Sequence, residues 1–171
     1  RLRVWDWQAA RILLEETVLM NGRRFAFHPD DEHLMAFGGD STLQLFSLTT
    51  GKEVSRSPAR FRHARGSFSP DGKSFVGNNP ELAVEIIDPT TWQTIATIPE
   101  AGPTVCGAWN AVEQYLVFGA TDGRVYGWDH AVRRGGFLTG GHDGPVIDLK
   151  FSPDGRILAS SGSDRMIHIR Y

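Results

Sequence analysis

The sequence predicts an all-β fold built from one repeated unit of four strands. Three features recur in step along the chain, at spacings of 41 or 42 residues. Glycine and proline are frequent, with 19 and 9 of 171 residues, which suits short strands and tight turns better than long helices. A period near 40 residues indicates a repeat architecture in which each unit needs its neighbours to bury both faces.

The first recurring feature is an aromatic residue that opens a turn. "FSPDG" begins at Phe68 and at Phe151, and the looser forms "FHPDD" and "WNAVE" begin at Phe27 and Trp109. Proline, aspartate and glycine are the residues that tight turns favour. The aromatic residue therefore predicts the end of a first strand, and the apolar run after the turn predicts a second strand.

The other two features mark the rest of the unit. An acidic residue lies thirteen positions after each aromatic one, at Asp40, Glu81, Asp122 and Asp164, and predicts the second turn. A third strand then ends at a recurring pair that twice is Trp-Asp. The members of this series are Val4-Trp5-Asp6, Leu45-Phe46-Ser47, Ile86-Ile87-Asp88, Gly127-Trp128-Asp129 and Ile169-Arg170-Tyr171.

A fourth, outer strand is expected after each Trp-Asp position that has enough chain beyond it. Residues 9–20, "AARILLEETVLM", have the propensity of a helix. They nevertheless occupy the same place in the register as "TTGKEVSRSPAR" and "PTTWQTIATIPE". We therefore predict a strand in this segment as well.

Composition excludes several classes of protein. The formal net charge is −2, which gives no general attraction to nucleic acid or to an anionic membrane. No apolar run approaches the roughly 20 residues needed to span a bilayer. Cys106 is the single cysteine, so an internal disulfide cannot form, and a reducing compartment such as the cytoplasm is favoured.

These residues resemble those of a WD-repeat β-propeller. The resemblance rests on "LRVWD", "VYGWDH" and "GGHDGPVIDLKFSPDGRILASSGSD", and it extends over the whole chain. It implies four-stranded antiparallel blades. We expect an open arc of three full blades between two partial ones, taken from a ring of about six to eight blades. The expected boundaries are 1–18 for the end of a first blade, 19–59, 60–100 and 101–141 for full blades, and 142–171 for a last blade without its outer strand.

The resemblance also assigns residues that hold each blade together. In the family, a histidine before the first strand, a serine or threonine, an aspartate and the tryptophan form a hydrogen-bonded tetrad. The last unit supplies the first three members but has Arg170 in the place of tryptophan, and no unit contains a complete tetrad. The residues assigned to these repeat positions are His142, Ser160, Asp164, Asp122, Trp128, Asp40, Trp5 and Asp6.

Two local clusters suggest other chemistry, but a structural role explains each of them. "FHPDDEHL" brings His28, Asp30, Asp31 and His33 together, as in a metal site, but it also aligns with the repeated turn, which explains it without a metal. The histidine, aspartate and serine of the last unit could form a catalytic set, but no Gly-x-Ser-x-Gly sequence accompanies them. We therefore predict no metal, no cofactor and no catalytic residue.

The resemblance implies a non-catalytic scaffold or a regulatory, sensor or signalling module that binds proteins or peptides at a rim of loops. Candidate partner-binding residues on that rim are Arg60, Arg62, Arg124 and Arg165. No nucleic acid, membrane or obligate small molecule is expected as a partner. The alternative is a ligand-binding or enzymatic propeller, of hydrolase or dehydrogenase type, with a site in the central channel.

Overall fold

The computed structural model describes sixteen strands of three residues or more and one strand of two residues, all antiparallel and arranged in five sheets. The residues described are 2–16, 25–38, 40–58, 61, 66–79, 81, 83–98, 104–110, 112, 115–129, 132 and 134–171. All regular structure within these residues is β. They contain no helix long and apolar enough to cross a membrane.

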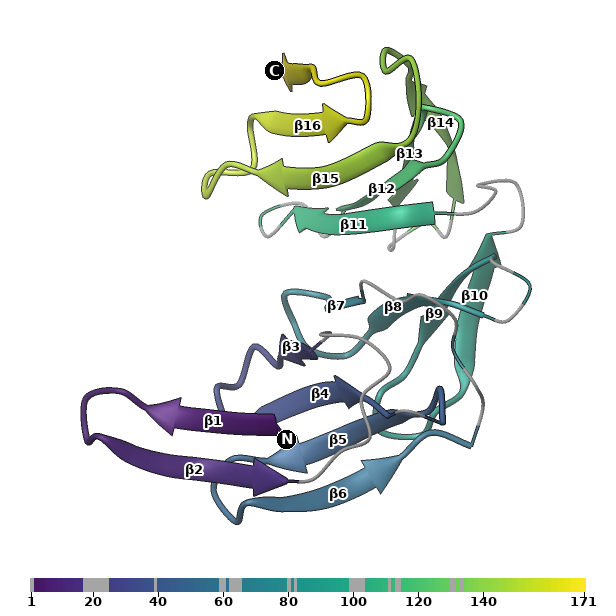
Figure 1. Ribbon diagram of the computed structural model, residues 1–171. Helices are drawn as coiled ribbons and strands as arrows, with labels where there is room; N and C mark the ends of the chain where they lie inside the picture. Colours follow the sequence, from purple (N-terminus) through teal and green to yellow (C-terminus); the bar gives the residue numbers. More distant parts are fainter. Residues whose placement is uncertain are drawn as a thin grey trace.

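The sheets follow one another along the chain (Figure 1). The first sheet has two strands, the next three have four strands each, and the last has three. The strands are β1 Leu2–Asp6 and β2 Arg11–Glu16; β3 Phe25–Phe27, β4 His33–Phe37, β5 Leu43–Ser47 and β6 Lys52–Arg56; β7 Ser67–Phe68, β8 Phe75–Asn78, β9 Val84–Ile87 and β10 Thr94–Ile98; β11 Thr104–Asn110, β12 Tyr115–Ala120, β13 Val125–Asp129 and β14 Arg134–Thr139; β15 Val146–Phe151, β16 Leu158–Gly162 and β17 Ile167–Arg170.

Within each sheet every strand pairs with the next one in the chain, so every sheet is a simple meander. Consecutive strands therefore alternate in direction, and the connections fall at two ends. We call one end the top rim: it holds the turns β4–β5, β8–β9, β12–β13 and β16–β17 and the connection between β14 and β15. The bottom rim holds the turns β3–β4, β7–β8, β11–β12 and β15–β16, together with the turns before the outer strands.

Apolar side chains fill the space between neighbouring sheets. Between the second and third four-stranded sheets, for example, Val76 and Ile86 pack with Leu116 and Phe118. Similar clusters join the other neighbouring sheets. Each sheet thus buries a face against the next one, which a lone sheet of about 40 residues could not do.

Strand alternation explains the recurring Trp-Asp position. Side chains on a strand point to opposite faces in turn. Phe46, Ile87 and Trp128 hold the tryptophan place, and each packs in the cluster shared with the preceding sheet. Trp5 holds the same place in β1 and is 55% exposed. A large apolar side chain here therefore joins one sheet to the sheet before it.

The residue after the tryptophan place forms the turn that leads to the outer strand. Asp6, Ser47, Asp88 and Asp129 each accept a hydrogen bond from a backbone N–H two or three residues later, at 2.7–3.2 Å. Short polar side chains stabilise turns in this way. Asp6 therefore has a defined structural role in the connection between β1 and β2.

The segment with helical propensity is a strand over Arg11–Glu16, as the register predicts. It pairs with β1, and Arg3 Nη2 lies 2.8 Å from Glu15 Oε1 across the two strands. Leu14 is buried against the next sheet. Tertiary packing therefore outweighs local propensity here.

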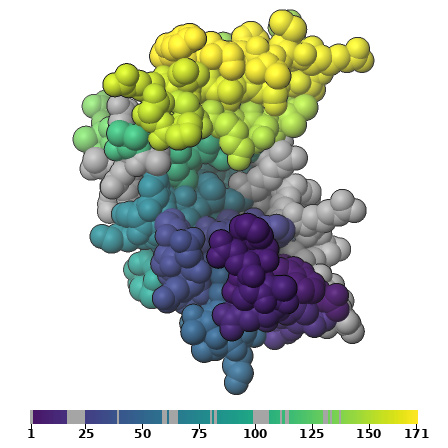
Figure 2. Space-filling view, turned by 90° about the vertical axis from the view of Figure 1, so that its left-hand side faces the viewer, coloured from purple at the N-terminus to yellow at the C-terminus, as the bar shows by residue number. Residues whose placement is uncertain are grey.

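The sheets form an open arc. In Figures 1 and 2 the first sheet lies in the lower half of the molecule and the last sheet at its upper end, and the four-stranded sheets follow between them along the chain. Among the described strands, β2 pairs with β1 alone and β17 with β16 alone. The predicted fold class, with three four-stranded sheets between two smaller ones, is confirmed, and a closed ring of four blades is not formed.

Candidate functional site

Four polar side chains join the last sheet to its top rim. His142 precedes β15, Ser160 lies on β16, Asp164 lies in the turn before β17, and Arg170 ends β17. His142 and Ser160 are 6% and 1% exposed. Buried polar groups of this kind need hydrogen-bond partners, and here they find them in one another.

The distances define a consistent order of donors and acceptors. His142 Nδ1 lies 3.0 Å from Asp164 Oδ2, and its Nε2 lies 2.9 Å from Ser160 Oγ. The carboxylate can only accept, so Nδ1 carries the proton and Nε2 accepts from the serine hydroxyl. Arg170 Nη1 then donates to the same Ser160 Oγ at 2.9 Å. Every member of this chain therefore has a partner.

Asp164 anchors the turn itself. It accepts the backbone N–H groups of Met166 at 3.0 Å and of Asp143 at 3.1 Å. These bonds, the Met166 N–H foremost, together with the His142 ring lower the pKa of its carboxyl group despite some opposing desolvation. The aspartate therefore stays ionised and links two connections of the top rim.

A glycine makes room for this contact. A Cβ on Gly162 would collide with the His142 ring and lie 2.6 Å from Asp164 Oδ1. The backbone of β16 can approach the histidine–aspartate pair only without a side chain at this position. The sequence "SSGSD" therefore encodes the site and not only a flexible turn.

Arg170 is the member that the sequence did not reveal. The family resemblance assigns tryptophan to its place, so the arginine counted as a departure from the pattern. In the structure the guanidinium supplies the N–H that bonds Ser160, and its Nη2 also donates to Gly140 O at 3.2 Å. An arginine offers five donors and can replace the single indole donor. The last sheet therefore contains a complete network of a different composition.

The third four-stranded sheet holds its top-rim turn with different side chains. Phe118 occupies the place of Ser160, and the Nε1 of Trp128 is buried with no partner among the described residues. Tyr126 stacks on Phe118 at 5.7 Å and donates its hydroxyl to Asp122 Oδ2 at 3.1 Å. Tyr126 therefore holds the aspartate of this turn, which is the role that His142 has in the last sheet.

The first two four-stranded sheets hold their top-rim turns through short polar side chains. Asp40 accepts from Thr42 Oγ1 at 2.7 Å and from Arg56 Nη1 at 3.2 Å. In the next sheet, Asn79 Oδ1 accepts the backbone N–H of Glu81 at 3.0 Å. The register points to Glu81 as the turn residue of this sheet, but Asn79, two positions earlier, forms the turn.

The candidate rim arginines divide into two groups. Arg60 and Arg62 lie outside the described residues. Arg124 and Arg165 lie in neighbouring top-rim turns and are exposed. Arg165 has a φ of 67°, in the left-handed region, where the preceding sheet has Gly123 at 82°. An arginine in this conformation costs roughly 1 kcal/mol, so the turn alone would favour glycine at this position.

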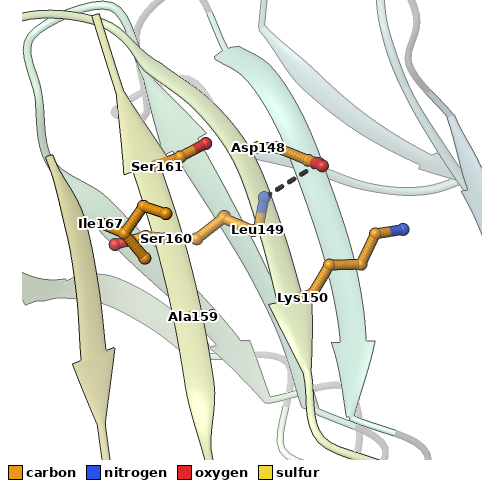
Figure 3. A pocket seen from close by; sticks show the side chains of 7 residues that line it. All are labelled: Asp148, Leu149, Lys150, Ala159, Ser160, Ser161 and Ile167. Atoms are coloured by element: carbon orange, nitrogen blue, oxygen red, sulfur yellow. Dashed lines mark hydrogen bonds between the residues drawn. The ribbon is translucent and has the colours of Figure 1, made fainter. Parts of the chain in front are cut away.

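Ser160, Cys106 and Asp148 do not meet in a catalytic centre. Ser160 is buried and bonded on both sides, unlike an accessible nucleophile. Cys106 is buried between sheets, with its Sγ 3.8 Å from Val146 O. Asp148 is exposed on the open face of the last sheet, where it lines a shallow hollow of about 160 Å³ across β15, β16 and β17 (Figure 3). Ligand pockets usually measure about 300–1,000 Å³.

Comparisons with known proteins agree with this geometry. A family model described as WD domain, G-beta repeat, matches residues 136–170, which include the complete network. The periodic tryptophan protein 2 homolog of Mus musculus is 24% identical over 174 residues, which cover 99% of this chain and 19% of that protein. The WD repeat-containing protein SL1-17 of Schistosoma mansoni is 32% identical over 76% of this chain and 44% of that protein.

A third relative is the eukaryotic translation initiation factor 3 subunit I of Phaeosphaeria nodorum, 28% identical over 72% of this chain and 40% of that protein. The chain thus spans between 19% and 44% of the length of these relatives. Stacked four-stranded meanders define the blades of a β-propeller. With the repeat match and the relatives, they show that the chain belongs to the WD-repeat family.

Proposed function

We propose that the chain is a non-catalytic scaffold that binds a protein or peptide at its top rim. The observation that carries the proposal is the position of Arg124 and Arg165, two exposed cations in neighbouring turns that are held by hydrogen-bonded aspartates. Guanidinium groups recognise carboxylates and phosphates well. The partner surface is therefore expected to be acidic or phosphorylated.

Rigidity supports this role. A partner that docks on ordered loops loses less conformational entropy than one that must order them. The Asp164 network fixes the last turn, and Gly123 of the preceding turn lies so close to His142 O that no side chain would fit between them. The two turns are therefore held side by side on the rim. One relative is by its name a subunit of a larger factor, which agrees with a scaffold.

The strained conformation of Arg165 offers a specific test. Replacing Arg165 by glycine should leave the free energy of unfolding unchanged or raise it by up to about 1 kcal/mol, because glycine tolerates a positive φ. The same change should weaken partner binding. A side chain retained for binding would thus give opposite effects on stability and on binding.

The experiment captures partners by cross-linking and mass spectrometry from cells that express the full chain. We compare the wild type with Arg124→Glu/Arg165→Glu, and with Arg156→Glu as a control, because Arg156 is exposed at the bottom rim. Partners that are lost only in the double variant support the proposal. Equal recovery with all three proteins, or equal loss with both variants, would contradict a top-rim contact.

A further inference from the structure

A second polar cluster lies at the bottom rim, in the turn between β3 and β4. The ligand atoms of His28, Asp30 and His33 all lie within 4.8 Å of one another. Their side chains are 20%, 36% and 29% exposed, so a dissolved ion can reach them. Asp31 has a φ of 58° in the glycine place of the turn and is not part of the cluster. The segment is the predicted turn, but it also gathers three potential metal ligands.

The turn itself does not require imidazoles, as the other copies in the chain show. In the second four-stranded sheet the three places are held by Ser69, Asp71 and Ser74, and Ser69 Oγ donates to Asp71 Oδ1 at 2.6 Å. In the last sheet Ser152 Oγ donates to Asp154 Oδ1 at 2.5 Å. A hydroxyl and a carboxylate therefore suffice to form the turn, and the two histidines of the first copy need another explanation.

The environment of His28 fixes which ring nitrogen is free to bind a cation. Its Nε2 lies 3.1 Å from Gly72 O, a group that can only accept, so Nε2 carries the proton. Its Nδ1 accepts the backbone N–H of Asp30 at 3.2 Å. In the third four-stranded sheet, Asn110 Nδ2 donates to Gly155 O in the same way, at 2.9 Å. Metal-binding histidines usually donate their other ring N–H to such a carbonyl or carboxylate.

The ring nitrogen of His28 that accepts the Asp30 N–H also faces a carboxylate. His28 Nδ1 lies 3.0 Å from Asp30 Oδ1, and His33 Nδ1 lies 2.7 Å from Asp30 Oδ2. Desolvation raises the pKa of Asp30, but hydrogen bonds from the His33 ring and from the N–H of Glu32 outweigh it and lower the pKa to about 2. In this tautomer His28 Nδ1 and Asp30 Oδ1 both present lone pairs, and a cation bound by both atoms would offset their mutual repulsion.

We propose that His28 Nδ1, Asp30 and a ring nitrogen of His33 bind a divalent first-row transition-metal ion such as Zn²⁺. Two imidazoles and one carboxylate form a ligand set that suits such ions and leaves a coordination position for water. Bonds of about 2.0–2.1 Å place tetrahedral ligands roughly 3.3 Å apart. The two histidine–carboxylate distances, 3.0 Å and 2.7 Å, lie within about 0.6 Å of that spacing.

The repeats supply variants that remove the ligands and keep the turn. His33→Ser introduces serine, the residue type that the second four-stranded sheet has at this place, as Ser74. His28→Asn introduces asparagine, the residue type that the third four-stranded sheet has at this place. There Asn110 bonds the neighbouring turn, so an asparagine at position 28 should keep the corresponding bond. Both variants should fold, so a loss of metal binding would report the ligands themselves.

The test is a titration of the full chain with Zn²⁺ by calorimetry, repeated with Co²⁺ to follow its visible absorption. We expect His28→Asn and His33→Ser to weaken one binding site by at least about tenfold. His168→Tyr is the control, because His142, Asp164 and His168 form the other histidine cluster of the described residues. It should leave this site unchanged.

Three results would overturn the proposal. The first is the absence of Zn²⁺ binding by the wild type. The second is binding of equal strength and stoichiometry in His33→Ser, which would place the ion elsewhere. The third is a visible spectrum of the Co²⁺-loaded wild type that His28→Asn and His33→Ser leave unchanged, which would show that these histidines are not ligands.

Discussion

Replacing Ser160 by alanine tests the hydrogen-bonded network of the last blade. The hydroxyl is 1% exposed and bonds both His142 Nε2 and Arg170 Nη1 at 2.9 Å. Its removal leaves a buried imidazole nitrogen and a charged donor without this partner. A buried group that loses its partner costs about 1–3 kcal/mol. We therefore expect Ser160→Ala to lower the free energy of unfolding by about 2–3 kcal/mol.

The assay is urea unfolding followed by tryptophan fluorescence, with hydrogen exchange of the β16 and β17 amides to locate the effect. With a slope of about 1–3 kcal/mol per molar urea, the midpoint should fall by roughly 1–2 M. Ser161→Ala is the matched control, because Ser161 points to the opposite face of β16 and should cost less than about 0.5 kcal/mol. Equal midpoints for the two variants would refute the network as a source of stability.

Two further predictions concern turns of the other blades. The pKa of Asp30 is lowered to about 2, so its contribution to stability is present above its unfolded pKa of about 3.9 and is lost as the pH falls toward 2. Acid unfolding of Asp30→Asn should lack this step, and an identical profile for variant and wild type would contradict it. Asn79→Ala should destabilise the protein by about 1 kcal/mol and Glu81→Ala by less than about 0.5 kcal/mol. Thermal unfolding measures this difference, and the reverse order would restore Glu81 as the turn residue.

The strands could be predicted because the same turn sequences recur in each unit. Pro-Asp-Gly sequences and the Trp-Asp positions depend on local chemistry, and they recur at fixed distances. Once one unit is aligned, the strand in Arg11–Glu16 follows from register although its local propensity favours a helix. The fold class was therefore accessible from the sequence alone.

The details of the site were less accessible, because they depend on which groups meet in space. Arg170 differs from tryptophan in shape and charge, yet both place an N–H donor near the serine. Asn79 lies two positions from the residue that the register selects. Phe118 removes the acceptor that Trp128 would need, which no local signal at Trp128 reveals. Alignment by residue type cannot detect such exchanges of function, whereas an inventory of donors and acceptors could.

The most direct test of the network is a double-mutant cycle between Ser160 and Arg170. Ser160→Ala and Arg170→Met each remove one partner of the 2.9 Å bond, and the double variant removes both. If the arginine completes the network, the free energies of unfolding should be non-additive by about 1–2 kcal/mol. A coupling energy below about 0.3 kcal/mol would show that Arg170 does not act in the place of tryptophan.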